Sequence, residues 1–165
     1  MEDFLQQLPQ LAQQKKKENT DFFKKLRKKK PKGLDGVVQE IHNEVFEEVD
    51  CLTCANCCKT TGPLFTNIDI DRIAKHFRMK PGDFIDQFLK VDEDQDYVLQ
   101  QTPCHFLGAD NYCSIYEVRP KACREYPHTD RRKIYQIGTL TVTNTSVCPA
   151  AYKIVERMKA SLPTL

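Results

Sequence analysis

Eight cysteines are the residues of this 165-residue chain whose type and spacing are best suited to chemistry. Four of them lie close together and four are spread over the second half of the chain: Cys51, Cys54, Cys57, Cys58, Cys104, Cys113, Cys123 and Cys148. A Cys-x-x-Cys turn lets two thiolates reach one ion, which is why zinc and iron–sulfur sites use this spacing. The pattern therefore predicts a metal site with all eight thiols as ligands.

The eight thiols divide into two sets, one from residues 51–58 and one from the four distant cysteines. They suffice for two tetrahedral zinc sites of four cysteines each, or for one iron–sulfur cluster with thiols to spare. Because the side chains of adjacent residues usually diverge, we expect Cys58 to bridge to or ligate a second centre instead of sharing that of Cys57. The sequence leaves open whether the cofactor is zinc, iron or an iron–sulfur cluster.

Cysteines have two other common uses. Eight of them could pair as four disulfides, but thiols stay reduced in the cytoplasm, which is the compartment that this sequence favours. A nucleophilic cysteine needs one activated thiolate beside a base and not eight thiols. Metal binding is therefore the favoured interpretation.

Other side chains near the cysteines are candidates for supporting roles. His105 and His128 are each a candidate metal ligand. Arg119 and Arg124 stand close to Cys123 in the sequence. Since a thiolate site carries negative charge, these two arginines are candidates for offsetting it.

The composition is that of a globular protein, with 40% hydrophobic and 29% charged residues. The first residues lack the basic and apolar regions of a signal peptide. No stretch approaches the roughly 18 apolar residues of a membrane span. These features predict a cytoplasmic protein without a transmembrane segment.

Residues 1–32 are predicted to form a basic helical N-terminal extension, and residues 33–165 a cysteine-cluster metal-binding domain. Ten lysines and arginines lie between Lys15 and Lys32, against two acidic residues, Glu18 and Asp21. The favoured explanation is that this basic helix packs on the acidic helix predicted over residues 37–49. The alternative is an acidic partner, which would be nucleic acid, an anionic membrane surface or an acidic protein.

The fold class indicated is α+β, with a mainly helical N-terminal half, a small antiparallel sheet and a closing helix, clamped by the cysteine-rich metal site. Apolar residues at helical spacing predict helices near residues 1–30, 37–49, 70–77 and 81–89, and again over 150–162. Short strands are expected at 97–100, 104–107, 112–116 and 134–142, with a turn at 108–111.

Several motifs together resemble one known family. They are Cys51-x-x-Cys54-x-x-Cys57-Cys58, Pro103-Cys104-x-Phe106-Leu107, Cys113-x-Ile115-Tyr116-x-x-Arg119-Pro120-x-x-Cys123-Arg124-x-Tyr126-Pro127, and Cys148. The chain resembles the YkgJ family of cysteine-cluster proteins over roughly residues 48–150. This resemblance implies a cytoplasmic protein that chelates zinc or iron.

Two classes of function follow from the resemblance and the residues. In the first, the metal is structural and the protein has a binding or interaction role. In the second, the protein is an enzyme that uses an iron–sulfur cluster for redox or group-transfer chemistry, since flagellin lysine-N-methylases have a similar cysteine cluster. With six glycines and no glycine-rich loop after a predicted strand, the sequence offers no residues for a methylase assignment.

Overall fold

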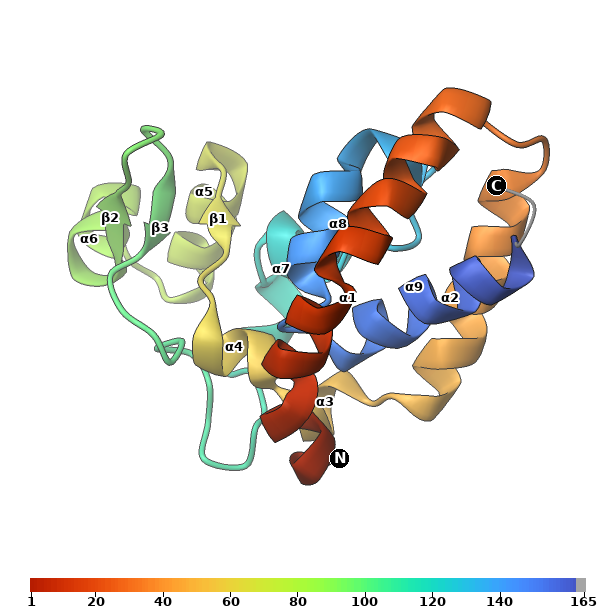
Figure 1. The fold of residues 1–165 in the computed structure, drawn as a ribbon. Coiled ribbons are helices and arrows are strands. Elements are labelled where there is room, and N and C mark those ends of the chain that lie inside the picture. The colour runs from red at the N-terminus through yellow and green to blue at the C-terminus, as the bar shows by residue number, and fades with distance from the viewer. Residues whose placement is uncertain (163–165) are drawn as a thin grey trace. The chain divides into compact units, whose positions relative to one another are not determined.

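The structure, a computed structural model, describes residues 1–162. The chain forms two compact units: a helical unit, made of Met1–Asp50 and the chain from Pro127 onward, and a cysteine unit, Cys51–Tyr126. The order of the elements along the chain can be followed in Figure 1. The boundary predicted between residues 32 and 33 falls within the helical unit, and the domain division based on it stays a prediction.

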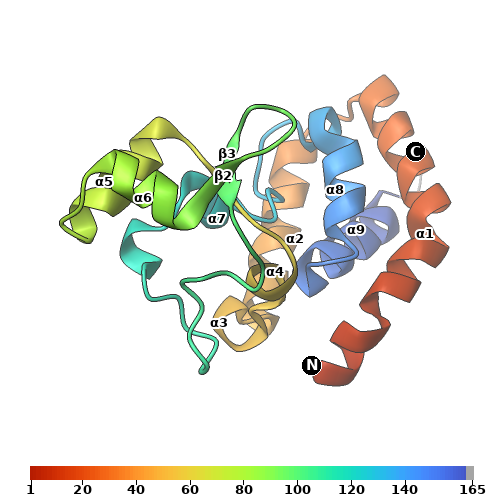
Figure 2. The same ribbon diagram turned by 90° about the vertical axis from the view of Figure 1, so that its left-hand side faces the viewer.

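The helical unit contains four α-helices and one 3₁₀ turn within the described residues. They are α1 (Glu2–Lys29), α2 (Leu34–Glu48), η2 (Ile134–Ile137), α8 (Gly138–Asn144) and α9 (Pro149–Ser161). Figures 1 and 2 both show α8 and α9 beside α1, and α1 contacts both helices. Phe22, Phe23 and Leu26 form part of the buried face of α1.

The predicted N-terminal helix is confirmed as α1, which continues past Pro9. It ends where Lys30 adopts a left-handed conformation, with φ 44°, just before Pro31. Gly33, with φ 75°, then precedes α2. The predicted break at residues 31–33 is thus present, because proline cannot continue a helix and glycine tolerates a positive φ.

The expectation that the acidic helix packs on the basic one is wrong. The helix α2 packs chiefly on α9, and Glu48 pairs with Lys153 at 3.3 Å and with Arg157 at 2.5 Å. The apolar stripes decide this choice, because Val45 of α2 and Ile154 of α9 are both fully buried. Burying one such side chain stabilises by about 1.5–3 kcal/mol, whereas an exposed ion pair contributes about 0–1 kcal/mol.

The strand predicted over residues 134–142 is also wrong, since this segment forms η2 and the start of α8. Thr141 and Thr143 satisfy their hydroxyls within the helix by donating to the carbonyls of Ile137 and Thr139. Gly138 lies so close to α1 that a Cβ placed on it would come 2.7 Å from the Cβ of Phe23. Packing on α1 therefore overrides the preference of β-branched residues for strands.

The cysteine unit is built from short elements around a small sheet. They are α3 (Cys51–Cys54), α4 (Asn56–Thr60), β1 (Leu64–Phe65), α5 (Asn67–His76), α6 (Pro81–Phe88), β2 (Leu89–Val91), β3 (Tyr97–Leu99), η1 (Tyr116–Val118) and α7 (Lys121–Glu125). The three strands are antiparallel in the order β1-β3-β2, with Phe65 opposite Tyr97 and Leu89 opposite Leu99. Figure 2 shows α5 and α6 side by side, with α6 leading into β2. The α+β class with a small antiparallel sheet and a closing helix, α9, is confirmed; the clamp by a metal site stays a prediction.

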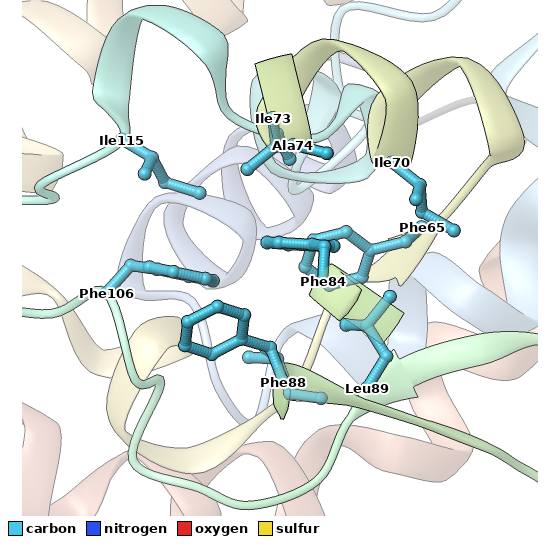
Figure 3. Close-up of a cluster of buried hydrophobic side chains, with 10 residues drawn as sticks. Phe65, Ile70, Ile73, Ala74, Phe84, Phe88, Leu89, Phe106 and Ile115 are labelled. Carbon is cyan, nitrogen blue, oxygen red and sulfur yellow. The ribbon is translucent and has the colours of Figure 1, made fainter. Parts of the chain in front are cut away.

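An aromatic core holds this unit together, as Figure 3 shows. The rings of Phe84 and Phe106 stack with centroids 6.2 Å apart, and Phe88 lies 5.1 Å from each of them. Ile115 is buried in the same cluster. Because Phe106 and Ile115 lie two residues after Cys104 and Cys113, this core fixes the backbone that carries both thiols.

The strands predicted at 104–107 and 112–116 are not formed. One isolated bridge joins Leu107 to Cys113 around the predicted turn, and Tyr116 begins the 3₁₀ helix η1. Cys104 donates its backbone N–H to the carbonyl of Cys58 at 2.7 Å, so this group is not available to a strand partner in the loop. The segment is therefore a narrow loop that contacts the first cysteines.

Candidate metal centre

The first four cysteines lie on two consecutive helical turns. Cys51 and Cys54 begin and end α3, and Cys57 and Cys58 are on α4. Ala55, between these turns, has a left-handed backbone with φ 47°, so α3 and α4 do not continue as one helix. Cys54 is buried, Cys51 is exposed, and the other two are half-buried.

The loop that carries Cys104 and Cys113 is held against these turns at two points. One is the hydrogen bond from Cys104 N–H to the Cys58 carbonyl. The other joins the tip of the loop to α3, because Asn111 Nδ2 donates to the carbonyl of Thr53 at 3.2 Å. The fold thus brings together residues more than 40 positions apart in the sequence.

Four thiols from separate segments lie near enough to influence one another's ionisation. Burial, aided by negative charge on Cys58 and Cys113, raises the pKa of Cys104 to about 11. Burial likewise raises the pKa of Cys123 to about 12, with added effects from Cys58, Cys104 and Cys113. Burial also raises the pKa of Cys113. Because the charge of Cys58 acts on each of the other three, these four thiols form one electrostatic group within the cysteine unit.

Cys58 differs from the other three thiols. A hydrogen bond from the Cys57 thiol lowers the pKa of Cys58 to about 7, although burial acts in the opposite direction. The two adjacent side chains therefore lie within hydrogen-bonding reach of each other, and the expectation that Cys58 serves a second centre stays a prediction. Successive side chains alternate by about 180° in a strand but are only about 100° apart in a helix, and both residues lie on α4.

The chemistry of these donors fits zinc or an iron centre. Seven of the eight cysteines belong to the cysteine unit. Thiolates are the ligands that zinc and iron–sulfur clusters favour. Within residues 1–162, no three His, Cys, Asp or Glu side chains are already arranged to hold an ion.

Cys148 belongs to the helical unit. It is buried at the N-terminal end of α9, where its Sγ accepts a hydrogen bond from the backbone N–H of Ala151 at 3.5 Å. Pro149 follows at the first helical position. The assignment of Cys148 as a metal ligand stays a prediction from the sequence.

Arg119 provides positive charge next to two of the thiols. Its guanidinium lies 3.8 Å from the centre of the Tyr116 ring and donates to the carbonyl of that residue at 2.6 Å. Its charge opposes the effect of burial on the pKa of Cys113 and of Cys123. This position fits the charge-balancing role predicted for Arg119, whereas Arg124 is exposed on α7.

The two histidine candidates lie in different units. His105 packs its ring against Phe88, with centroids 4.8 Å apart, in the cysteine unit. His128 is in the helical unit and has a left-handed backbone, with φ 65°. Their roles as ligands stay predictions.

Asp69, a buried residue of α5, is not among the residues that the sequence predicts for the site. Thr66 is the N-cap of α5, and Asp69 at the third helical position completes a capping box with it. Its carboxylate also accepts hydrogen bonds from Arg72 Nη2 at 2.6 Å and from the backbone N–H of Lys121 at 3.1 Å. Burial alone would raise the pKa of Asp69, but the hydrogen bonds from Thr66, Arg72 and Lys121 outweigh it and lower that pKa.

Arg72 extends the same connection. It donates to the carbonyls of Val118 at 3.2 Å and Arg119 at 2.9 Å. Together, Asp69 and Arg72 bind the backbone just before α7 and at its first residue, and α7 is the helix that carries Cys123. The pattern Thr-x-x-Asp is typical of a capping box, but nothing local in the sequence reveals the contact with residues 118–121.

Comparison with known proteins places the cysteines within one domain. A family model described as "CxxCxxCC: Putative zinc- or iron-chelating domain" matches residues 50–149, a range that contains all eight cysteines. No curated protein and no solved structure matches the chain. Among the helices of residues 1–162, none is long and apolar enough to cross a membrane.

Proposed function

The chain belongs to the CxxCxxCC family of zinc- or iron-chelating domains, and we propose that it binds its metal through cysteine thiolates as a structural centre that supports a binding or interaction role. The main support is the electrostatic group of Cys58, Cys104, Cys113 and Cys123. These thiols come from α4, the 104–113 loop and α7, which are connected by few regular backbone hydrogen bonds. Shared coordination would join these short segments directly.

The ionisation of the four thiols supports their use as ligands. Cys58 is partly a thiolate at neutral pH, so it offers the first charge that attracts a cation. The other three bind an ion only after losing their protons, and a bound metal supplies the positive charge that drives this loss. Arg119 offsets part of the negative charge that remains on the thiolates.

The remaining cysteines complete the proposed ligand set. Cys51, Cys54 and Cys57 lie on the turns adjacent to Cys58 and would serve a second centre or a cluster. Cys148 is included because the family match ends just after it. Since the ligands come from distant parts of the chain, we propose that metal binding is coupled to folding.

Purification without oxygen, followed by metal analysis and an ultraviolet–visible spectrum, tests this proposal. We expect zinc at one or two ions per chain, because a filled tetrahedral thiolate site suits a structural role, and a colourless protein, because zinc is a d¹⁰ ion. A brown protein with iron and acid-labile sulfide would favour the alternative, an iron–sulfur redox or group-transfer enzyme. A folded protein with neither metal nor cluster would overturn both.

Ligand assignment needs variants as well as metal content. Replacing Cys104 or Cys123 by serine should lower the bound metal and weaken the absorption of cobalt-substituted protein from thiolate-to-cobalt charge transfer. Ser114→Ala is a matched control, because Ser114 lies next to Cys113 without being a candidate ligand. Unchanged spectra in the cysteine variants would exclude those two thiols from the centre.

A second role is proposed for the basic residues Lys15–Lys32, namely contact with an acidic partner. The observation that favours it is the packing of α2 on α9. Two of the glutamates expected to neutralise α1, Glu44 and Glu48, instead pair with Arg157. Binding that is abolished when these lysines are replaced would support this role.

A further inference from the structure

The basic residues of α1 are continued by a second basic segment that is distant in the sequence. Lys30, just after α1, places its Nζ 5.9 Å from the centre of the Tyr135 ring. Lys30, Lys133 and Tyr135 also line one open pocket of about 280 Å³. The segment 131–133, Arg-Arg-Lys, therefore lies at the C-terminal end of α1 within the helical unit. We call α1 residues 15–30 and segment 131–133 the composite basic surface.

Few acidic groups neutralise this surface. Glu18 pairs with Lys15 at 3.0 Å, Asp21 with Lys24 at 3.9 Å, and Asp35 with Arg132 at 3.6 Å. Such exposed pairs are weak and screened by salt. Four further lysines are exposed and form no ion pair within the described part of the chain: Lys16, Lys17, Lys25 and Lys28. The surface therefore carries a large excess of positive charge.

The apolar side of α1 is buried within the helical unit. Phe22, Phe23 and Leu26 are buried in the helical unit. A helix that lies on a membrane needs its apolar face free to enter the lipid. No large hydrophobic side chain is exposed between residues 15 and 32 or at 130–133. The surface thus offers charge without an apolar anchor, which argues against a membrane.

The length over which lysines are exposed on α1 suits a long, uniformly charged polymer. Lys16 and Lys28 are 12 residues apart on a continuous helix, which corresponds to about 18 Å at a rise of about 1.5 Å per residue. Duplex DNA carries about one negative charge per 1.7 Å of axis when both strands are counted, so a duplex segment of this length carries about ten phosphates. Lysines and arginines that contact phosphates need no apolar surface and no sequence-specific geometry.

We propose that the composite basic surface binds the phosphate backbone of nucleic acid without sequence preference. The proposal rests on the acidic-partner role suggested for α1 and extends it to segment 131–133. It does not depend on the metal centre, which is tested separately by metal content.

The test uses the full-length, metal-loaded protein and fluorescence anisotropy with a 20-base-pair DNA duplex and a single-stranded RNA of mixed sequence. Three double variants are compared: Lys24→Gln with Lys28→Gln on α1, Arg131→Gln with Lys133→Gln in the second segment, and Lys75→Gln with Lys80→Gln in the cysteine unit as the control. All three remove the same charge from exposed positions.

Both variants of the composite basic surface should bind more weakly, and the control should bind like the wild type. For the duplex, the slope of log affinity against log salt should fall by about 0.9 for each phosphate that is no longer neutralised, or about 2 per double variant. If only the α1 variant weakens binding, the surface is not composite. If the control variant weakened binding equally, the loss would reflect the net charge of the protein, and the proposal of a specific surface would be rejected.

Two further outcomes would overturn the choice of partner. Vesicles containing phosphatidylserine are measured under the same conditions, together with polyglutamate as an acidic peptide. Binding to either of these without binding to nucleic acid would keep the acidic-partner role and reject the nucleic-acid proposal. Absence of binding to all of them at low salt would reject both.

Discussion

Asp69 and Arg72 form an ion pair, with 2.6 Å between Oδ1 and Nη2, whose two members also hold the same distant segment of backbone. Asp69 accepts the N–H of Lys121, and Arg72 donates to the carbonyls of Val118 and Arg119. The side chain of Asp69 is only 2% exposed. A pair one turn apart on α5 thus fixes the entry to α7, where Cys123 lies.

Asp69→Asn should therefore destabilise the cysteine unit by about 3 kcal/mol, because it leaves a partly buried arginine without its charge partner. Urea unfolding of the metal-loaded protein, followed by circular dichroism, measures this change. Asp71→Asn is the matched control, since Asp71 is exposed on the same helix. A destabilisation below about 1 kcal/mol would mean that the pair contributes no more than a surface ion pair.

A second stability test concerns the contact between α8 and α1. Gly138→Ala should destabilise the helical unit by about 1–3 kcal/mol, because the added Cβ would come 2.7 Å from the Cβ of Phe23 and force the helices apart. Thermal unfolding should show a lower midpoint for this variant.

Gly36→Ala is the control for this change. Gly36 lies in α2, and a Cβ there would have no atom within 4 Å. Alanine should stabilise this helix by up to about 1 kcal/mol, since it restricts the unfolded chain more than glycine does. If both glycine variants behaved alike, close packing at Gly138 could not be the cause.

Patterns that act over a few residues were sufficient to predict most helices. The helices predicted near residues 81–89 and over 150–162 are confirmed as α6 and α9, which begin at Pro81 and Pro149, where the missing N–H of proline is not needed. The stripe of Ile154 and Met158 correctly identifies the buried face of α9. The spacing of the first cysteines likewise predicts a metal-binding family, and the chain matches the CxxCxxCC family model of zinc- or iron-chelating domains.

The errors concern choices made between distant residues. Charge suggested that α2 packs on α1, but hydrophobic burial against α9 outweighs weak surface pairs. Propensity suggested a strand over residues 134–142, but packing of Gly138 on Phe23 selects a helix. The association of Cys58 with Cys104 depends on the aromatic core around Phe106, which no local pattern reveals.

Metal affinity should rise steeply with pH. The pKa values of Cys104, Cys113 and Cys123 are raised by burial, so these thiols are protonated in the metal-free protein at neutral pH. If all three become ligands, binding releases about three protons, and the binding constant should rise by about three powers of ten per pH unit between pH 7 and 8. Competition with a chromophoric zinc chelator measures this slope. A slope below one would show that the metal does not displace the protons of these buried thiols.

Cys58 should be the first of the four grouped thiols to react with iodoacetamide in the metal-free protein at pH 7. The pKa of Cys58 is lowered to about 7 by the hydrogen bond from Cys57, while burial raises the pKa of Cys104 to about 11. This difference favours the Cys58 thiolate by about 10⁴, and the lower nucleophilicity of a more acidic thiol reduces the rate advantage to about 10². Peptide mass spectrometry after short labelling times gives the rate at each site.

Variants of Cys57 identify the cause of that reactivity. Cys57→Ala removes the donor and should slow labelling of Cys58 about fivefold at pH 7, because the pKa of Cys58 returns towards the ordinary thiol range. Cys57→Ser keeps an O–H group at the same position and should retain most of the rate. An alanine variant that labels as fast as the wild type would assign the reactivity of Cys58 to exposure, and the hydrogen bond between adjacent thiols would then have no part in it.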